Sequence, residues 1–575
     1  MKNNNILQIF YSRNLLLIFA MALFSISCND SVLQEKPLDF LTPSNAYTTK
    51  AGASQGISGL YTYARDKMIS AEQSMAILYG LGSDVTFHGE NPSAGWGLTD
   101  YKRDLTSTNG NITWYWKNGY IIIQRTNVLI DGIKNSELKN WKDEQERKAY
   151  LAEAMFFRAN EYRILVYLFG DVPLITEVVA SPKTDFIRAP KAEVYKQIEQ
   201  DLTFACANLP LPGKEEATGR INQGAAWHLL SEVYLAEGKF QLAADAAGKV
   251  ISGYNYSLMT KRFGTKLGND VFGSGDVFYD LFQKDNQNLK ENTENIWALQ
   301  FEPNLINGGG QYNGPRFFGP CYWQMGNAPD GKKAIVGKMY NGVLTGYQDT
   351  LNRPVGWSKP TNYLAYDIWR SDWNKDIRNA KHNIKRDFYF DNSASIYNKK
   401  KIDFNLYKLA GVTSRDNIRD TCQYIFPYFI KCTTPLEYFA DFARMGGGGV
   451  HKDIYAMRLA ETYLFRAEAY LGLGKKDLAA DDINVVRRRA NATPITTAQV
   501  TLNYILDERA RELYAEEMRT LTLLRLGLLV ERVRTYNNNP INAKNNIQDY
   551  NNLWPIPQTE IDLNLGAKLV QNPGY

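Results

Sequence analysis

Aromatic side chains in glycine-rich and proline-rich loops are the residues of this chain with the clearest chemical potential. Trp96 lies in the polar loop at residues 91–97, Tyr322 and Trp323 end the segment at residues 307–325, and Trp357 lies at residues 354–360. These loops offer no regular helix that would bury a large ring. Sugars have apolar C–H faces and polar rims, so exposed aromatic rings beside hydrogen-bonding groups suit them. The pattern predicts a glycan-binding surface that includes these four aromatic residues.

Two charged residues near Trp96 are candidate hydrogen-bonding partners for a sugar. Asp84 lies in a Gly-Ser-Asp-Val stretch, and Arg103 follows the Trp96 loop. Either residue has an ordinary structural explanation as well, because an aspartate often caps a loop and an arginine is often a solvated charge. We include both in the predicted site.

The remaining tryptophans are expected in the core. Trp116, Trp227 and Trp297 fall inside segments with regular periodicity. Trp369 and Trp373 are spaced i and i+4, which on a helix gives a stripe that usually packs inward. We therefore leave these five residues out of the predicted site.

The start of the chain predicts export and lipid attachment. The basic residues Lys2 and Arg13 precede an apolar run at residues 15–24. This run is well short of the roughly 20 residues that a membrane-spanning helix needs. The small residues Ser25 and Ser27 then lead to Cys28, as in a lipoprotein cleavage site. We predict that Cys28 becomes the lipidated first residue; the alternative is an ordinary secretory signal with a chance cysteine.

Composition argues against several classes of function. The formal net charge of +5 over 575 residues gives no case for nucleic-acid binding. No Cys-x-x-Cys motif and no Cys/His cluster has zinc spacing, so we predict no metal site and no cofactor. Cys422 and Cys432 could form a disulfide across a hairpin, or they could be two buried free thiols. Cys206 and Cys321 have no predicted partner.

An internal repeat at an offset of 236 residues reveals two helix pairs. Its first copy is Glu232, Tyr234, Leu235, Gly238, Lys239, Leu242, Ala243, Ala244 and Asp245; its second copy is Glu468, Tyr470, Leu471, Gly474, Lys475, Leu478, Ala479, Ala480 and Asp481. In each copy an apolar helix ends at a Gly-Lys turn, and small alanines let a second helix approach closely. Pairs of this size look like tetratricopeptide units, which pack on neighbours to bury a shared core.

Further helices flank the repeat, and a different region separates its copies. Residues 143–168 have helical periodicity and stop at Gly170, with Pro173 just beyond. From about Leu506 the charges alternate in sign, which indicates a solvated or ion-paired face rather than catalysis. Residues 261–450 are rich in Gly, Asn, Pro and aromatic residues, and predict loops, short strands and brief helices.

Several motifs, in this order, resemble those of the SusD/RagB family of surface nutrient-binding lipoproteins. The resemblance runs from Cys28 to Tyr575, and its motifs are Trp116, Tyr120, Ile123 and Asn127; residues 152–162 and 168–174; residues 458–470; residues 484–490; residues 508–512 with Glu516 and Arg519; residues 554–558; and the closing Gln571-Asn-Pro-Gly-Tyr575. The resemblance implies a mainly α fold, in which tetratricopeptide-like helix pairs form a scaffold under a loop-rich insert with short strands and helices.

The same resemblance implies a domain organisation. Residues 1–27 would be a lipoprotein signal peptide, and residues 28–575 a single SusD-like domain. Within it we expect a helical scaffold at about residues 40–260 and 450–535, a variable ligand-binding region at about residues 261–450, and a C-terminal extension at residues 536–575.

The resemblance also implies a function and a place. Such proteins sit on the outer membrane, held by their lipid, and pass an oligosaccharide or polysaccharide to a SusC-like TonB-dependent transporter without cleaving it. Some relatives serve peptide uptake, which is our alternative for the ligand. A glycoside hydrolase would need two carboxylates about 5 to 10 Å apart, and no motif identifies such a pair.

Overall fold

The computed structural model describes residues 46–67, 76–90, 98, 100–268, 270–303, 305, 308–309, 311–411, 420–436, 448–539 and 543–575. The chain divides into the units Met1–Ala46 and Tyr47–Tyr575, and every described helix and strand belongs to the second. Residues 1–27 and Cys28 lie outside the described residues, so the signal peptide and the lipidation site stay predictions. No helix in the described part of the chain has both the length and the apolar character needed to cross a membrane.

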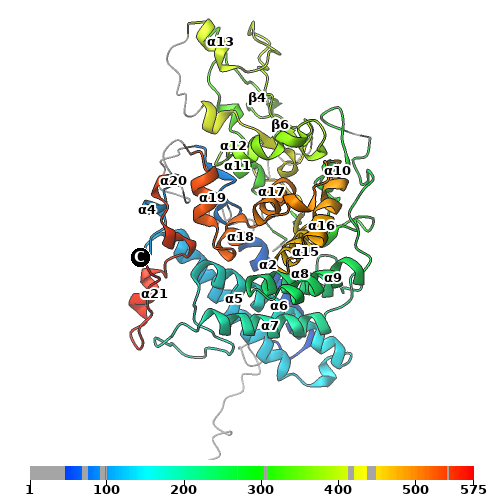
Figure 1. Ribbon diagram of the computed structural model, residues 1–575, viewed down its shortest axis with the longest axis vertical. Coiled ribbons are helices and arrows are strands. Elements are labelled where there is room, and N and C mark those ends of the chain that lie inside the picture. The colour runs from blue at the N-terminus through cyan, green and yellow to red at the C-terminus, as the bar shows by residue number, and fades with distance from the viewer. Residues whose placement is uncertain are drawn as a thin grey trace, which may run out of the picture. The chain divides into compact units, whose positions relative to one another are not determined.

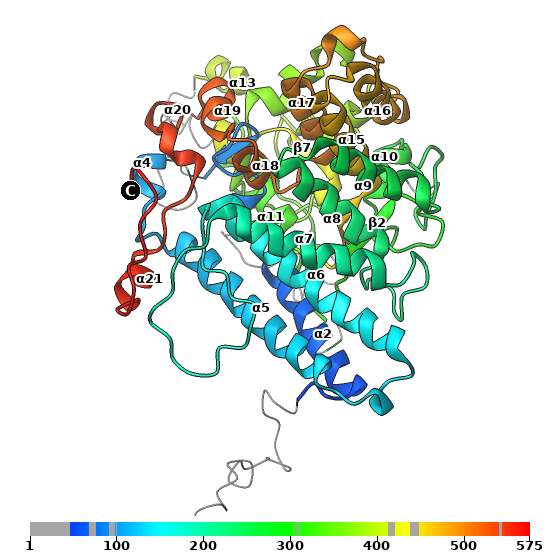
Figure 2. The same ribbon diagram turned by 60° about the horizontal axis from the view of Figure 1, so that its bottom comes forward.

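Longer helices pack one on the next and confirm the mainly α fold (Figures 1 and 2). They are α2 (Lys50–Arg65), α5 (Gly110–Lys134), α6 (Glu144–Phe169), α7 (Lys191–Asn208), α8 (Gln223–Ala236), α9 (Phe240–Gly253), α15 (Leu459–Gly472), α16 (Lys476–Arg489), α17 (Leu502–Leu513), α18 (Arg519–Arg525) and α19 (Leu529–Tyr536). Helix α5 packs on α6, α6 on α7, α7 on α8 and α8 on α9. Helix α9 then packs on α15, which also contacts α16 and α17, so segments far apart in sequence share one stack.

Helix α6 shows why the sequence forms this stack. The Asp143 side chain accepts a hydrogen bond from the Glu146 amide at 2.8 Å and caps the first turn, where two acidic residues also favour the positive end of the helix dipole. Gly170 ends the helix at a φ of 72°, as predicted. Arg158 in α6 binds Asp201 in α7 at 2.7 Å, and both are buried, so neighbouring helices are joined by paired charges as well as apolar contacts.

The internal repeat is visible in the backbone. Gly238 and Gly474 have φ values of 71° and 73°, and the following lysine amides donate to Tyr234 O at 2.8 Å and to Tyr470 O at 2.9 Å. The two pairs also contact each other, because Leu235, Ala243 and Ala244 share one apolar cluster with Phe465 and Ala469.

The repeated glutamates have the same role in both copies. Glu232 accepts hydrogen bonds from Arg163 in α6 at 3.0 and 3.1 Å, and Glu468 accepts from Arg525 in α18 at 2.6 and 2.7 Å. Each carboxylate is thus held by one arginine of an adjacent helix, which explains why a buried position of the repeat is acidic in both copies.

Short elements make up most of the region between the two helix pairs. Its helices include α10 (Val277–Leu281), α11 (Gly314–Phe318), α12 (Asn362–Ala365) and α13 (Phe404–Leu409). Four antiparallel pairs join β1 (Thr86–His88) to β5 (Ser358–Pro360), β2 (Asn295–Leu299) to β8 (Ile454–Arg458), β3 (Met339–Tyr340) to β4 (Val343–Leu344), and β6 (Ile384–Lys385) to β7 (Tyr428–Phe429). In Figure 1, β4, β6 and α13 lie at the end opposite α5 and α7.

The charged segment after Leu506 is ion-paired, and it is buried. Glu508 and Glu512 of α17 are both fully buried, and they bind arginines from three other segments. Arg378 Nη1 lies 2.8 Å from Glu508 and 2.9 Å from Glu512, and Arg458 Nη1 lies 2.6 Å from Glu512. These ion pairs connect α17 to the segment around residue 378, which belongs to the loop-rich region.

The closing motif fastens the C-terminal segment to the ends of the long helices. This segment includes α20 (Ala543–Asn546) and α21 (Gln558–Leu563). Asn572 Nδ2 donates to Phe169 O at 2.9 Å and to Trp554 O at 2.7 Å, and Arg188 donates to Asn572 Oδ1 at 2.6 Å. Trp554 is buried against Tyr115 and Phe169. The polar closing residues therefore satisfy carbonyl groups at the end of α6.

Candidate functional site

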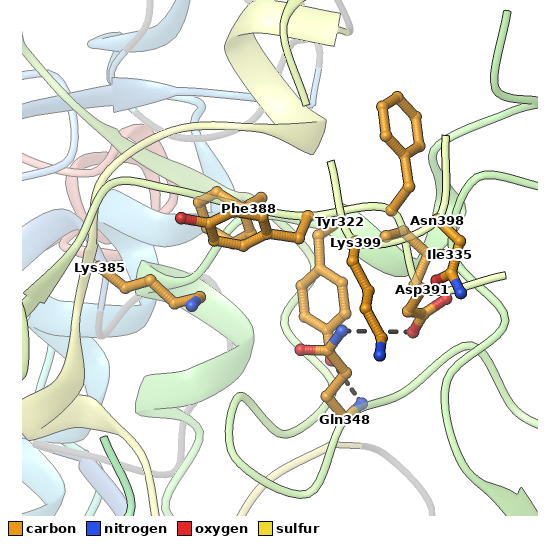
Figure 3. A pocket seen from close by; sticks show the side chains of 10 residues that line it. Tyr322, Ile335, Gln348, Lys385, Phe388, Asp391, Asn398 and Lys399 are labelled. Carbon is orange, nitrogen blue, oxygen red and sulfur yellow. Dashed lines mark hydrogen bonds between the residues drawn. The ribbon is translucent and has the colours of Figure 1, made fainter. Parts of the chain in front are cut away.

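A pocket of about 520 Å³ lies among the loops around β6 (Figure 3). It is lined by Tyr322, Ile335, Gln348, Lys385, Phe388, Tyr389, Phe390, Asp391, Asn398 and Lys399. The volume falls within the range of about 300 to 1,000 Å³ that is typical of small-molecule sites. Aromatic, amide and charged side chains therefore surround a space large enough for a small molecule.

Asp391 holds one wall of the pocket in place. Its Oδ1 accepts from the Val336 amide at 2.6 Å, and its Oδ2 accepts from the Gly337 amide at 3.1 Å and from Gln348 Nε2 at 3.3 Å. Gly337 has a φ of 65°, and a Cβ there would approach the Gly346 carbonyl carbon to 2.3 Å, so only glycine fits. The carboxylate is thus used to fix two loops and Gln348 beside the cavity.

Aromatic rings line the pocket as well. The rings of Tyr322 and Phe388 stack with centroids 6.3 Å apart, and Tyr389 is 46% exposed. Lys385 Nζ lies 5.8 Å from the Phe388 ring centroid and 6.0 Å from that of Tyr389, and burial lowers its pKa. In Figure 3, Lys385 approaches from one side, whereas Tyr322, Gln348, Lys399 and Asp391 gather on the other.

Tyr322 lines this pocket, but it is not the exposed platform that we predicted. The residue is 1% exposed, its hydroxyl donates to Asn352 O at 2.9 Å, and the same oxygen accepts from the Gln348 amide at 2.7 Å. The hydroxyl is therefore committed to the loop that carries Gln348, and Tyr322 contributes a fixed ring to the pocket wall.

Trp323 belongs to a neighbouring cluster on the same loop. Its Nε1 donates to Pro354 O at 2.7 Å, its ring meets that of Tyr347 edge-on at 4.9 Å, and Arg353 lies 4.9 Å from its centroid. The ring is partly buried. Because Tyr347 directly precedes the pocket residue Gln348, the structure brings the Trp323 cluster next to the pocket.

Trp357 lies beside Glu90. Its Nε1 donates to Glu90 Oε2 at 2.8 Å. Trp357 directly precedes β5, which pairs with β1. Arg316 lies 5.1 Å from the Trp357 centroid. Trp96 itself is outside the described residues, so its place in a site stays a prediction.

The position of Asp84 does not support the prediction that it binds ligand. Asp84 is fully buried, and its carboxylate accepts from Arg519 at 2.7 and 3.0 Å and from Arg532 at 2.9 Å. These two cations hold the pKa of Asp84 at about 2, well below its usual value, despite burial. The residue joins the segment before β1 to helices α18 and α19 and is not accessible to a ligand.

Arg103 is placed elsewhere. It lies in α4 (Tyr101–Asp104) and pairs with Asp104 at 2.6 Å, on a helix that packs against α20. It is not among the residues that line the pocket, and Figure 1 shows α4 away from β6. A binding role for Arg103 stays a prediction without support from its position.

The expectation that Trp373 packs inward is wrong, whereas Trp369 is buried as expected. The segment Asp367–Asp372 forms a 3-10 helix, which has three residues per turn, so positions four apart do not share a face. Trp373 is 40% exposed.

Sequence reasoning also missed most pocket residues. Lys385, Phe388, Tyr389 and Asp391 lie in one run of charged and aromatic residues within the loop-rich region, and this clustering was the available signal.

No group of three His, Cys, Asp or Glu residues in the described ranges is arranged to hold a metal ion. Cys422 and Cys432 are buried thiols, which settles the question of a hairpin disulfide between them. For Cys432, burial raises the pKa to about 11. The thiol is therefore protonated at neutral pH and unreactive.

Two family models match the chain over most of its length. The SusD family matches residues 293–575, and a family described as starch-binding and associating with the outer membrane matches residues 42–235. The chain belongs to the SusD/RagB family. It is 23% identical over 574 residues to SusD-like protein P25 of Formosa agariphila, with 96% of each chain covered. It is 26% identical over 437 residues to the starch-binding protein SusD of Bacteroides thetaiotaomicron, covering 74% of this chain and 72% of that relative.

Solved structures show the SusD-like fold. A laminarin binding SusD-like protein superposes with a TM-score of 0.64 at 24% identity, covering 92% of this chain and all of the other. A SusD homologue from Bacteroides thetaiotaomicron gives a TM-score of 0.68 at 20% identity, covering 93% and 98%. At these identities the likeness concerns the fold, and the ligand of this SusD-like protein must be argued from its own residues.

Proposed function

We propose that this protein captures an oligosaccharide or polysaccharide in the β6 pocket and delivers it to a SusC-like TonB-dependent transporter in the outer membrane. The observation that carries the proposal is the pocket itself, which the half-exposed Tyr389 lines together with Gln348, Lys385 and Lys399. A ring face and convergent amide and ammonium groups suit the apolar face and polar rim of a pyranose. Membership of a family with starch-binding and laminarin-binding relatives supports it.

The pocket favours a glycan over a peptide. A peptide bound in extended form pairs its backbone with free main-chain groups of the receptor. Here the amides of Val336 and Gly337 are already taken by Asp391, and the Gln348 amide is taken by Tyr322. None of these three amides is available to the backbone of a bound peptide.

The proposal includes binding without cleavage. Among the ten lining residues Asp391 is the single carboxylate, and it accepts three hydrogen bonds from the pocket wall. Hydrolysis of a glycosidic bond normally uses two carboxylates, one as acid and the other as base or nucleophile.

A lipid on Cys28 would hold the protein at the outer-membrane surface. If one or two ring contacts hold the glycan, its dissociation constant is expected between about 1 μM and 1 mM. Such weak binding suits a protein that captures the glycan and then releases it.

Affinity electrophoresis of the mature protein through gels containing single polysaccharides tests the proposal. Retardation by at least one neutral glycan is expected, and Tyr389→Ala should weaken it about fivefold or more, since a stacked ring contributes about 1 kcal/mol or more. Tyr389→Phe keeps the ring and should retain binding, and Tyr550→Ala removes an exposed tyrosine outside the pocket. Unchanged binding of Tyr389→Ala would exclude the pocket, and no retardation by any glycan, with binding of peptides instead, would exclude the function.

A further inference from the structure

Two exposed aromatic rings form a surface outside the pocket. Tyr366 and Trp373 are 41% and 40% exposed, their ring planes are inclined by 14°, and their centroids lie 6.4 Å apart. They flank the 3-10 helix Asp367–Asp372 at its two ends. Single exposed hydrophobic residues are common on proteins, whereas adjoining exposed rings form the kind of patch that marks interaction sites.

An arginine lies against both rings. The Cζ atom of Arg386 is 4.7 Å from the Trp373 centroid and 5.8 Å from the Tyr366 centroid. Its Nη2 donates to Ala365 O at 2.8 Å and to Asn379 Oδ1 at 2.7 Å, which fixes the guanidinium plane. Within the described residues its Nη1 has no hydrogen-bond partner, and no carboxylate lies within ion-pair distance of the group.

The acid whose charge acts on this arginine is already paired with a lysine. Asp387 is paired with Lys401 at 2.5 Å. Burial lowers the pKa of Arg386 to about 10, so the side chain keeps its charge at neutral pH without a paired anion. Partly buried arginines usually have a carboxylate or phosphate partner, because the planar fork matches those groups.

The surface is distinct from the pocket although it is adjacent in sequence. Lys385, at the end of β6, lies over the pocket rings of Phe388 and Tyr389, whereas the next residue, Arg386, lies over Tyr366 and Trp373. Neither Tyr366, Trp373 nor Arg386 lines the pocket.

We propose that Tyr366, Trp373 and Arg386 form a second binding site, for a sugar that carries a carboxylate, such as a uronic acid within a glycan chain. The rings would cover the apolar face of the pyranose, and Arg386 would bind the carboxylate through Nη1. The inference rests on the proposed function in one respect, that the ligand is a glycan. A second site on the same chain would raise the effective affinity for a polymer that reaches both sites.

Calorimetric titration of the mature protein with an oligogalacturonate and with a neutral β-glucan oligosaccharide tests the site. Arg386→Gln should weaken oligogalacturonate binding about tenfold or more, the usual value of a hydrogen bond to a charged group. Trp373→Ala should weaken it about fivefold. Both variants should bind the neutral oligosaccharide within about twofold of the wild-type protein, and 0.5 M salt should weaken only the acidic ligand.

Three controls keep the outcomes distinct. Arg534→Gln makes the same charge change at an arginine of α19 paired with Asp549, and should bind oligogalacturonate normally. Tyr389→Ala alters the pocket and should leave the oligogalacturonate site intact. Thermal midpoints identify any variant that has lost its fold, and Trp373→Ala removes an exposed ring, so it stays informative if Arg386→Gln unfolds.

Normal oligogalacturonate binding by Trp373→Ala, or binding of the neutral oligosaccharide alone by the wild-type protein, would refute the acidic site and leave the proposed function standing. Failure of the wild-type protein to bind any glycan would refute both.

Discussion

Replacing the buried carboxylate of Glu512 is the most demanding test of how the loop-rich region is attached to the helices. Glu512 is fully buried and meets three arginines, with Arg458 at 2.6 Å, Arg378 at 2.9 Å and Arg489 in direct contact. Glu512→Gln keeps the shape of the side chain and removes its charge. Three arginines would then share fewer anions, and the new amide could not accept from all of them.

The expected loss is large because none of these groups can reach water. Removing one partner from a buried ion pair costs about 3 to 5 kcal/mol. With an unfolding entropy of about 2 cal/mol/K per residue, a chain of this size loses about 3 to 5 °C in its thermal midpoint. The cost should appear as a shift in the urea midpoint with an unchanged slope, since the variant buries the same surface.

The measurement is urea unfolding of the mature wild-type protein, Glu512→Gln and the control Glu531→Gln, followed by circular dichroism. Glu531 is an exposed acid of α19, so its variant should stay within about 0.5 kcal/mol of the wild-type protein. A loss below about 1 kcal/mol in Glu512→Gln would show that the network does not stabilise the fold as its geometry implies.

Three further predictions follow from the same contacts. Acid should unfold the protein, because Arg378, Arg511 and Arg487 hold the pKa of the buried Glu508 carboxylate at about 2. A carboxylate whose pKa is lowered in the folded state contributes stability that is complete above about pH 5 and is lost as the pH falls toward 2. Urea unfolding midpoints measured between pH 7 and pH 3 should therefore fall with the pH. Asp84→Asn should cost about 3 to 5 kcal/mol in urea yet leave glycan affinity of the folded protein unchanged, and a selective loss of affinity would restore Asp84 to the site. Gly472→Ala should destabilise the protein by about 1 to 3 kcal/mol, because a Cβ there would lie 2.5 Å from the Phe240 ring. The control Gly248→Ala in α9 has open space around its Cβ and should stabilise the protein by about 0.5 to 1 kcal/mol. Equal effects of the two variants would contradict the close contact of the two helix pairs.

Local signals predicted the scaffold well. The periodicity of residues 143–168, the stop at Gly170 and the two Gly-Lys turns correspond to α6 and to the pairs α8–α9 and α15–α16. Such features depend on interactions within a few residues, such as a cap, a left-handed glycine or a helical stripe. A sequence read along its length contains all of them.

Long-range contacts decided the candidate site, and here the sequence misled. Asp84 resembles a loop cap, but it is buried because Arg519 and Arg532 meet it from more than 400 residues away. Trp373 has the spacing of a buried helical stripe, yet a 3-10 turn leaves it exposed. No local pattern distinguishes a buried ion pair from a solvated one.

By itself, the sequence determined the helical scaffold, its internal repeat, the family and the chemistry to look for, since periodicity and motifs are properties of adjacent residues. Only the tertiary structure decided which aromatic and charged residues face a ligand. Lys385 and Arg386 are neighbours in the chain, yet one lies over the pocket rings and the other over Tyr366 and Trp373. The physical reason is that exposure and charge pairing are set by what the rest of the chain places around a residue.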